Sequence, residues 1–313
     1  MQHTLTIILN WNNPQDTILV AQEVLSHHNS TVVLVDNDST DQSLVDIQAH
    51  FQKMHEGIVW QEEASISIHN TEKPALYLVS MKENYGFAKA INKIIKAIPS
   101  HSFQFVWLLN NDAIPAAKAL VALETEMFQN SHLGFAGSVI LDYQERQKIQ
   151  CCGVQYFPFI GISKLVLKNQ HFDSLNPEMI SNERIDFQHG ASLLVRLEIV
   201  DKIGLMDERF FLYFEEQDWQ IRGKKLGFDN KLIAESCVFH KGSMSTEHAK
   251  HLFFFFYNSS AVVYSLKHNN LVQIFFSFFG ILLISLKRTK LKAKSLLWAL
   301  KGIVNGMKIF TTS

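Results

Sequence analysis

The sequence predicts an α/β protein whose mostly parallel β-sheet is covered by helices on both faces. The first observation is that apolar, largely β-branched runs alternate with segments of helical character through the first half of the chain. The second is that these runs do not alternate with polar residues, which is typical of strands buried on both faces of a parallel sheet. The 313 residues, of which 47% are hydrophobic, suffice for one large or two modest domains.

Each strand predicted in the first half is followed by a predicted helix. The strands are Leu5–Trp11, Thr31–Asn37, Ala75–Met81 and Phe103–Asn110. The helices run from Pro14 to about His27, from about Gln42, over Phe87–Ile98, and from Pro115. Proline suits a first helical turn because an amide hydrogen would have no partner there. Residues 51–74 break this rhythm, and we interpret them as an insertion in the form of a hairpin.

The second half of the chain is less regular. Residues 134–142 predict another strand, and residues 187–204 predict a strand, with Gly190 near its middle, that runs into a helix. A charged helix is expected from about Glu215, and a short strand is expected to end at His240.

Polar residues gather at the carboxyl ends of three predicted strands, where ligands bind in parallel sheets. The clusters are Asn10-Trp11-Asn12, Asp36-Asn37-Asp38 and Asn110-Asn111-Asp112. Asp112 suits Mg²⁺, which takes one or two protein carboxylates and completes its shell with phosphate oxygens and water. The alternative is that Asp112 caps the helix expected from Pro115. Asp36 is placed to accept hydrogen bonds from a ribose or a base, whereas Asp38 or Ser39 is placed to cap the next helix.

Three other segments carry candidate site residues. Asn84 and Gly86 lie at another strand end, where the glycine allows a tight turn or a close backbone approach. The carboxylates of Glu215, Glu216 and Asp218 cluster beside Trp219. Such a cluster can have raised pKa values and supply a general base, although an acidic first helical turn is also favoured by the helix dipole. A lone histidine such as His240 is usually structural, but with Asp112 it could complete a metal site.

Several classes of protein are disfavoured by what the sequence lacks. It has no G-x-G-x-x-G motif for a dinucleotide and no Walker A sequence. The cysteines Cys151, Cys152 and Cys237 fit neither a disulfide framework nor a zinc spacing, which suggests a reducing cytosol. The apolar run near the amino terminus is too short for a signal peptide and follows no basic region.

The order of these motifs resembles that of the family 2 glycosyltransferases. Six segments occur in register over roughly residues 4–245: LNWNN, VDNDSTD, ENYGFAKAIN, LLNND, HGASLLVR and ERFFLYFEEQDWQIR. The most similar subgroup is the rhamnosyltransferase-like enzymes of bacterial surface polysaccharide synthesis. The resemblance implies a GT-A fold and an inverting transfer of one sugar from a nucleotide-diphosphate donor, with dTDP-rhamnose favoured. The catalytic domain would span residues 1–247, with a donor-binding half over about 1–114 and an acceptor half over about 115–247.

The resemblance also assigns roles to particular residues. It implies that Asp112, helped by His240, binds Mg²⁺ or Mn²⁺ on the donor diphosphate. It implies that Glu216 is the general base, with Glu215 and Asp218 as the other catalytic carboxylates. Residues expected to bind the nucleotide sugar are Asn10, Trp11, Asn12, Asp36, Asn37, Asn84, Gly86, Asn111, Gly190 and Ala191.

The sequence departs from the family pattern at a few positions. Asn110 replaces the first aspartate of Asp-x-Asp, which predicts fewer protein ligands for the metal. Glu216 replaces an aspartate and lengthens the base by one methylene group, and Lys89 stands where a glycine is frequent. Gln-x-x-Arg-Trp, expected in processive synthases, is absent, so we expect a single sugar to be added per encounter.

The last 66 residues differ in charge from the rest of the chain. Residues 1–247 hold all 30 acidic and 20 basic residues, a net charge of −10, whereas residues 248–313 hold 9 basic residues and no acid. Residues 271–286 carry no charge, and lysines recur every seven residues from Lys287 to Lys308, beside an apolar stripe. This pattern predicts a helix with one basic and one apolar stripe, so that residues 271–310 lie on an anionic membrane surface, and residues 251–257, HLFFFFY, favour the same interpretation. The uncharged run is somewhat shorter than the roughly 20 residues of a membrane-spanning helix, so a spanning placement is the other possibility. The alternative is a helix packed on the catalytic domain with a solvated lysine face.

The leading hypothesis is therefore a glycosyltransferase at the cytoplasmic face of the inner or plasma membrane that extends a glycan or a lipid-linked acceptor. Nucleic acid is not expected as a partner because long apolar runs separate the basic residues. A sugar-nucleotide pyrophosphorylase is a second hypothesis, but its glycine-rich phosphate loop is missing near the amino terminus. A third is a catalytically inactive, glycan-binding relic of the same fold, which the changes at Asn110 and Glu216 would permit.

Overall fold

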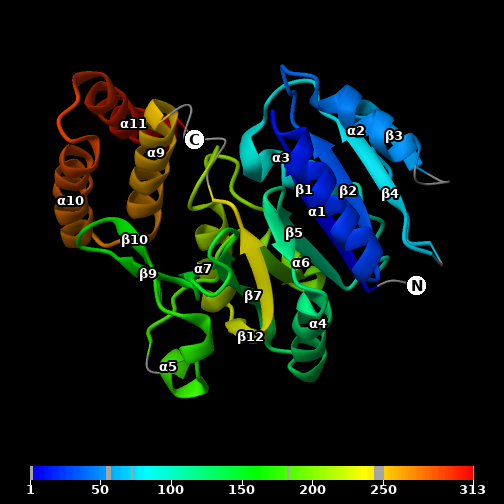
Figure 1. Cartoon of the computed structure of the whole chain (residues 1–313). Helices are drawn as coiled ribbons and strands as arrows, with labels where there is room; N and C mark the ends of the chain where they lie inside the picture. Colours follow the sequence, from blue (N-terminus) through cyan, green and yellow to red (C-terminus); the bar gives the residue numbers. More distant parts are fainter. Residues whose placement is uncertain (1–2, 54–57, 72, 182, 243–249, 313) are drawn as a thin grey trace.

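A computed structural model of the chain describes residues 3–53, 58–71, 73–181, 183–242 and 250–312. A twisted central sheet has helices packed on its two faces, and three C-terminal helices stand together at one side of it (Figure 1). Within the described residues the main sheet has ten strands, in the order β3-β4-β2-β1-β5-β11-β7-β12-β6 with β8 paired to β7.

The first half of the sheet is parallel, as the sequence predicts. Its strands are β1 (Thr4–Asn10), β2 (Ser30–Asp36), β3 (Ile58–Glu62), β4 (Leu76–Ser80) and β5 (Phe105–Asn110). The second half mixes directions and consists of β6 (Ala113–Pro115), β7 (Leu133–Asp142), β8 (Ile149–Cys151), β11 (Ser192–Arg196) and β12 (Asp229–His240). β11 runs antiparallel to both β5 and β7, and β12 is parallel to β7.

Helices cover both faces because the strands bury side chains on both sides. The helices are α1 (Pro14–His27), α2 (Ser43–Gln52), α3 (Gly86–Lys96), α4 (Ala119–Gln129), α6 (Leu197–Ile203) and α7 (Glu215–Lys225). Along β2, Val32 and Leu34 join the core under α1, α2 and α4, whereas Val33 and Val35 join the core under α3 and α6. This alternation on a fully apolar strand is the packing that its sequence predicts.

Strand register brings the predicted polar clusters to one edge of the sheet. Asn10 pairs with Asp36, Asp36 pairs with Ser80, and Asn110 pairs with Leu9. The carboxyl ends of β1, β2, β4 and β5 therefore lie side by side, and the loops that follow them share one edge.

Two boundaries in the middle of the chain differ from the prediction. No helix begins at Pro115, because residues 113–115 form β6 and pair with β12, and α4 begins at Ala119. Gly190 does not lie within a strand either, since β11 begins at Ser192. In both cases a tertiary pairing that local sequence does not reveal decides where the element begins.

The predicted hairpin within residues 51–74 is also wrong. β3 pairs in parallel with β4, with Ile58 opposite Leu76, and extends the sheet by one strand at its edge. Ile58 and Trp60 are half-buried and pack against the core that α2 also contacts. A parallel edge strand buries these apolar residues, which a solvent-exposed hairpin would leave in water.

A second small sheet projects from the domain and was not predicted. It is a hairpin of β9 (Val154–Phe157) and β10 (Ile162–Leu165), paired antiparallel. Within the described residues, the elements outside the C-terminal region also include the short helix α5 (Pro177–Ser181) and the turns η1 (Glu63–Ser65) and η2 (Phe172–Ser174).

The C-terminal region consists of α9 (Lys250–His268), α10 (Leu271–Thr289) and α11 (Ala293–Thr312). The predicted boundary after residue 247 lies outside the described residues. Beyond it, Ala261, Val262, Val263 and Tyr264 of α9 are fully buried in the same core as α1 and α4. Residues 251–257 are half-buried on α9, which argues against their use as a membrane signal. α9 is thus a packed helix of the same fold as the central sheet.

The lysine stripe is divided between two helices. Lys287 lies in the last turn of α10, whereas Lys294, Lys301 and Lys308 lie on α11. Lys290 and Leu291 separate the helices with left-handed backbone conformations, φ 49° and 58°. The predicted single amphipathic helix is therefore a helix pair. Among the described residues, Leu271–Thr289 alone is long and apolar enough to cross a membrane by length and composition, with mean hydropathy 1.7.

Candidate active site

A cavity of about 740 Å³ opens where the carboxyl ends of the parallel strands meet the amino ends of α7 and α9. Twelve of the residues that line it are site residues or strand-end residues named from the sequence: Trp11, Asn37, Asn84, Gly86, Asn110, Asn111, Asp112, Gly190, Ala191, Glu215, Glu216 and His240. Four predicted site residues do not line it: Asn10, Asn12, Asp36 and Asp218.

Asp112 lies in the turn between β5 and β6, next to His240 at the end of β12. The antiparallel pairing of His240 with Ala113 sets the two side chains side by side, with 3.1 Å between Asp112 Oδ1 and His240 Nε2. Burial tends to raise the pKa of Asp112, but the hydrogen bond and charge of His240 outweigh burial and lower it. Since α4 begins seven residues after Asp112, this carboxylate does not cap the helix.

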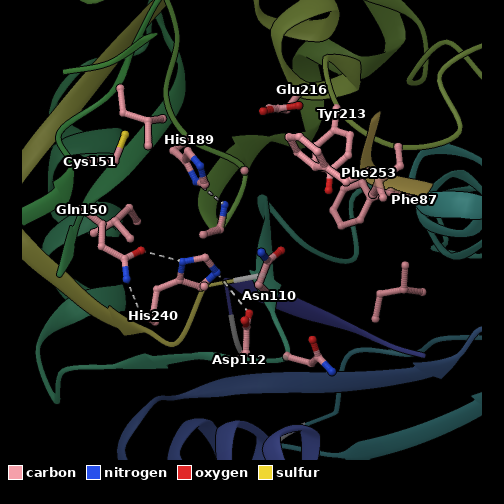
Figure 2. A pocket seen from close by; sticks show the side chains of 18 of the residues that line it. Phe87, Asn110, Asp112, Gln150, Cys151, His189, Tyr213, Glu216, His240 and Phe253 are labelled. Carbon is pink, nitrogen blue, oxygen red and sulfur yellow. Dashed lines mark hydrogen bonds and ion pairs between the residues drawn. The ribbon is translucent and has the colours of Figure 1, made fainter. Parts of the chain in front are cut away.

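Gln150 fixes which nitrogen of His240 faces Asp112. Its amide nitrogen donates to the backbone oxygen of His240 at 2.7 Å and to Asp142 Oδ2 at 3.2 Å. The amide oxygen therefore faces His240 Nδ1, at 3.0 Å, and accepts a hydrogen bond from it. Neutral His240 would then turn the lone pair of Nε2 toward a carboxylate oxygen. This arrangement is repulsive unless a proton or a metal ion lies at that position (Figure 2).

The donor set fits a divalent cation with few protein ligands. A carboxylate oxygen and an imidazole nitrogen are both ordinary ligands for Mn²⁺, and the carboxylate suits Mg²⁺. Among the described residues, no group of three or more His, Cys, Asp or Glu side chains is placed to hold a metal. Asp112 and His240 would therefore leave most coordination positions to oxygens of a bound ligand and water.

Glu216 lies across the cavity from Asp112 and His240 (Figure 2). Tyr213 and Phe214 have left-handed conformations, φ 71° and 68°, and lead into α7, whose first two residues are Glu215 and Glu216. Gly190 leaves room for the Glu216 side chain, because a Cβ at Gly190 would lie 3.4 Å from Glu216 Cγ. Burial raises the pKa of Glu216 to about 7, so this carboxyl titrates near neutral pH.

Glu215 is more deeply buried than Glu216, with 5% of its surface exposed. Its Oε2 has no hydrogen-bond partner among the residues that the structure describes. Burial, followed by the nearby charge of Glu216, raises its pKa well above the ordinary value. Of the two carboxyls, Glu216 is the less deeply buried and is therefore better placed to exchange a proton with a bound ligand.

Asp218 has a different environment from its neighbours on α7. Its side chain is fully buried and forms ion pairs with Lys267 and His268 of α9, each at 2.7 Å, and with Arg222 at 2.9 Å. Burial alone would raise the pKa of Asp218, but these partners lower it. Asp218 joins α7 to α9 and does not reach the cavity, so we no longer assign it to catalysis.

Amide side chains order the loops that follow β2 and β4 at one side of the cavity. Asn37 Nδ2 donates to Asn84 Oδ1 at 2.9 Å, and Asn37 Oδ1 accepts from the backbone nitrogen of Tyr85 at 3.1 Å. Asn84 Oδ1 also accepts from the backbone nitrogen of Gly86 at 3.0 Å. Gly86 has φ +72°, and a Cβ there would lie 2.3 Å from the backbone oxygen of Phe211. The glycine is needed for both its conformation and this close approach.

Asp36 supports the loops beneath the cavity. It accepts hydrogen bonds from Asn10 Nδ2 at 2.8 Å and from Ser39 Oγ at 2.6 Å, and it is 3% exposed. Asn12 Oδ1 accepts from the backbone nitrogen of Thr40 at 2.7 Å. In this conformation these three predicted nucleotide-binding residues hold the β1 and β2 loops together, whereas Trp11 borders the cavity with 37% of its surface exposed.

Solved structures share this architecture. A mannosyltransferase from Pyrobaculum calidifontis, solved with GDP-Man and Mn²⁺, has a TM-score of 0.56 over 99% of this chain and 87% of its own, at 12% identity. GalNAc-T7, solved with UDP, GalNAc and Mn²⁺, has a TM-score of 0.57 at 12% identity, and the match covers 98% of this chain but only 57% of GalNAc-T7. Glucosyl-3-phosphoglycerate synthase from Mycobacterium tuberculosis has a TM-score of 0.50 at 11% identity, over 86% of this chain and 82% of its own.

The fold is GT-A. This confirms the fold predicted from the sequence. No family model matches the chain, and no curated protein matches it. At these identities the likeness establishes the fold of the chain, and the chemistry has to be argued from its own residues.

Three parts of this GT-A cavity were missed by sequence reasoning. Gln150 lies in no recognisable motif, and its role depends on a contact with a residue 90 positions away. His189 borders the cavity and has a pKa lowered to about 4, by burial and then by His240, so it is neutral. His189 directly precedes Gly190 in the HGAS segment, and this place within a motif could have marked it as a cavity residue. An aromatic wall, defined here as Phe87, Phe211, Tyr213, Phe253 and Phe256, also lines the cavity.

The aromatic wall combines residues from three parts of the chain. Phe211 stacks on Phe256 of α9 with 4.5 Å between ring centroids, and Tyr213 meets Phe253 edge to face at 5.4 Å. Helix α9 therefore contributes to the cavity directly. The sequence signal was the aromatic run at residues 251–257, which we had attributed to a membrane.

Proposed function

We propose that the protein is an inverting, non-processive glycosyltransferase. It would move one sugar from a nucleotide-diphosphate donor, with dTDP-rhamnose as the favoured donor, to a glycan or lipid-linked acceptor of a cell-surface polysaccharide. The observation that carries this proposal is the placement of the Asp112–His240 pair and of Glu216 on opposite sides of one cavity at the ligand-binding edge of a GT-A sheet (Figure 2). The similar mannosyltransferase, solved with GDP-Man and Mn²⁺, and GalNAc-T7, solved with UDP, GalNAc and Mn²⁺, support it.

Asp112 and His240 would hold Mg²⁺ or Mn²⁺ on the donor diphosphate. When bound, the cation neutralises negative charge that develops on the departing diphosphate. Gln150 keeps a hydrogen on His240 Nδ1 and so leaves Nε2 available as a ligand. Asn37, Asn84 and Gly86 order the loop next to the donor, and Trp11 offers an aromatic surface for the base.

Glu216 would act as the general base on the acceptor. Its carboxylate would accept the proton of an acceptor hydroxyl while the oxygen attacks the anomeric carbon from the side opposite the diphosphate. The bond from that carbon to the diphosphate breaks as the new bond forms, so one displacement inverts the anomeric centre. A pKa of about 7 suits a base that must be ionised near neutral pH yet still hold a proton.

The aromatic wall supports an acceptor that is a sugar or carries an apolar group. Aromatic faces pack against either kind of surface. We further propose that residues 271–310 bind an anionic membrane surface and hold the enzyme at the cytoplasmic face of the membrane. The uncharged run of α10 and the basic residues that follow it support this placement.

Donor binding is the test that separates an active transferase from an inactive relic of the same fold. Purified protein would be heated with dTDP-, UDP- and GDP-sugars, with and without Mn²⁺, beside Asp112→Ala and the exposed control Glu145→Ala. We expect one nucleotide class to raise the melting temperature only when Mn²⁺ is present. Asp112→Ala should abolish this shift and Glu145→Ala should preserve it. If no donor stabilises the wild type, the proposal is wrong.

A further inference from the structure

The apolar face of α10 is continuous with the turn of the β9–β10 hairpin. Large apolar side chains are exposed along α10: Leu271, Val272, Phe275, Phe276, Phe279 and Leu283, at 50–85% of their surface. The hairpin turn adds Phe159 and Ile160, at 55% and 40%. Phe159 meets Phe276 edge to face, with ring centroids 6.3 Å apart, so the two exposed surfaces touch.

The hairpin is held against α10 by close backbone packing. Gly280 of α10 allows the backbone of Ile160 to approach so closely that a Cβ at Gly280 would lie 2.3 Å from the Ile160 oxygen. In the opposite direction, Gly161 has φ +68°, and a Cβ there would lie 2.8 Å from Ser277 Cβ. Two glycines, one on each element, thus let the turn and the helix pack as one unit.

A side chain at the α9–α10 corner fixes the hairpin from its other side. Asn269 donates to the hydroxyl of Tyr156 at 2.9 Å and to the backbone oxygen of Pro158 at 3.2 Å. The hairpin therefore has a defined position relative to α10, and its turn lies beside that helix (Figure 1). Exposed apolar residues held in place by such contacts form a surface for an apolar partner.

We propose that α10 and the hairpin turn together form one membrane-inserting surface, with Phe159 and Ile160 entering the lipid beside Phe275, Phe276 and Phe279. The inference rests on the proposed membrane association of α10 and adds a second, separate segment to it. Seven basic residues follow the uncharged part of α10, from Lys287 to Lys308, and no acid occurs after Glu247. Anionic lipid headgroups complement this charge, whereas a second copy of the same surface would bring only like charges.

The test compares how tightly three double variants bind lipid vesicles. The hairpin variant is Phe159→Ser with Ile160→Ser, and the α10 variant is Phe275→Ser with Phe279→Ser. The matched control is Val121→Ser with Phe128→Ser on α4, where both side chains are about half exposed. Flotation would use vesicles of phosphatidylcholine alone and vesicles with about one third phosphatidylglycerol. We expect the wild type and the control to float with the anionic vesicles, and the hairpin variant to bind about tenfold more weakly.

The outcomes distinguish lipid insertion by the hairpin turn from membrane binding by α10. If the α10 variant floats like the wild type, membrane binding by α10 is itself wrong. If the α10 variant loses binding while the hairpin variant keeps it, only the hairpin inference is overturned. If light scattering without lipid finds a dimer that the hairpin variant converts to a monomer, a second copy covers this surface and the inference is wrong. Donor binding by each variant checks that the catalytic fold is intact.

A second measurement remains informative if the double variants fold poorly. Phe159→Cys would be labelled with an environment-sensitive fluorophore, beside Phe128→Cys on α4 and with the unsubstituted protein as the labelling background. Anionic vesicles should shift the emission of the label at position 159 to shorter wavelength and leave position 128 unchanged. An unshifted spectrum at 159 in protein that floats with vesicles would overturn the inference.

Discussion

At the scale of single residues, the cavity separates two carboxylates by chemistry as well as by position. Asp112 has a lowered pKa because His240 bonds to it, whereas Glu216 has a pKa raised to about 7 because it is buried. One is therefore ionised throughout the physiological range and suits a metal ligand. The other changes protonation state within that range and suits a base. The surroundings of Asp112 and Glu216, more than the difference between aspartate and glutamate, suit them to these two roles.

Glu216 predicts how the transfer rate depends on pH. Below about pH 7 its carboxyl is protonated and cannot accept a proton, so kcat/KM should fall as the pH falls through about 7. Glu216→Gln should lower kcat by about a hundredfold to ten-thousandfold and leave donor affinity unchanged. The measurement is a pH–rate profile with donor binding as the control. A flat profile between pH 5.5 and about 8, or a fully active Gln variant, would show that another group is the base.

Gln150 predicts a specific loss of metal affinity. Gln150→Ala removes the acceptor for His240 Nδ1 and frees the ring to turn, so Mn²⁺ should bind about tenfold more weakly. Isothermal titration of Mn²⁺ in the presence of the nucleotide would measure this without relying on turnover. Gln144→Ala, an exposed glutamine nearby, is the matched control and should bind Mn²⁺ like the wild type. Equal affinities for both variants would mean that Gln150 does not position His240.

At the scale of elements, α7 and α9 are joined by buried charges. Asp218 pairs with Lys267 and His268, and Lys267 also contacts Asp207 at 2.5 Å. Both carboxyls have lowered pKa values, since these bonds outweigh the effect of burial. The same helix pair carries Glu216 on one member and part of the aromatic wall on the other. The ion pairs therefore fix how Glu216 stands relative to the aromatic wall.

Asp218→Asn should lower the free energy of unfolding by about 3 kcal/mol, because it leaves buried cations without their partner. Urea denaturation would measure the loss. Glu198→Gln, which removes an exposed pair with Lys202, is the control and should change stability by less than about 1 kcal/mol. Similar losses in both variants would contradict a special role for the buried pairs.

The same carboxyls predict the response of stability to acid. Their folded-state pKa values lie below the ordinary value of 3.8, so the folded protein binds fewer protons than the unfolded chain around that pH. The stability that they contribute is complete above about pH 5 and is lost progressively as the pH falls below 3.8. In Asp218→Asn, the free energy of unfolding should fall less steeply as the pH drops below 3.8. Denaturation curves at a series of pH values would measure this, and an unchanged slope would contradict the assignment.

Elements with a strong local signal could be predicted, and those defined by distant pairing could not. The continuous apolar runs of β1, β2, β4 and β5, and Pro14 at the start of α1, set the limits of these elements nearly to the residue. β6 is three residues long and exists only because β12 pairs with it, so Pro115 resembled a helix start. The β9–β10 hairpin likewise depends on α10 for its position, and local sequence carries no trace of that contact.

Site residues followed the same division. Asp112, Glu216 and His240, which the sequence placed at one predicted site, line the same cavity, and each follows or begins a recognisable element within a motif. Gln150 was missed because its partner is 90 residues away. Asp218 was assigned wrongly because the spacing within an acidic helix turn cannot reveal that its neighbour on the other side is Lys267. The sequence could predict which strand ends gather, but not which side chains turn into the space between them.

At the scale of the whole molecule, the C-terminal helices pack on the same core as the central sheet. Tyr264 is fully buried, Ser260 Oγ donates to the backbone oxygen of Leu212 at 2.8 Å, and Phe253 and Phe256 line the cavity. The division after residue 247, which the sequence suggested from charge and hydropathy, does not separate two cores.

Truncation tests this unity. A chain ending at residue 247 would expose the core that α9 covers and would leave Asp218 buried without Lys267 and His268. We expect such a chain to lack a cooperative thermal transition and to lose donor binding. Calorimetry and the donor-binding assay would check this against the full chain. A stable, donor-binding fragment 1–247 would instead establish an independent catalytic domain.

The contact between Arg288 and Tyr257 fixes the position of the cavity relative to the end of α10. The guanidinium carbon at the end of α10 lies 5.0 Å from the ring centroid of Tyr257, one turn along α9 from Phe253 in the aromatic wall. If Arg288 rests among lipid phosphates, the cavity opens at nearly the same level. A sugar joined to its lipid by a short linker would reach Glu216, and one carried far out on a long glycan would pass above it. Distance from the bilayer would then select the acceptor, and the protein would extend glycans that are still near their anchor.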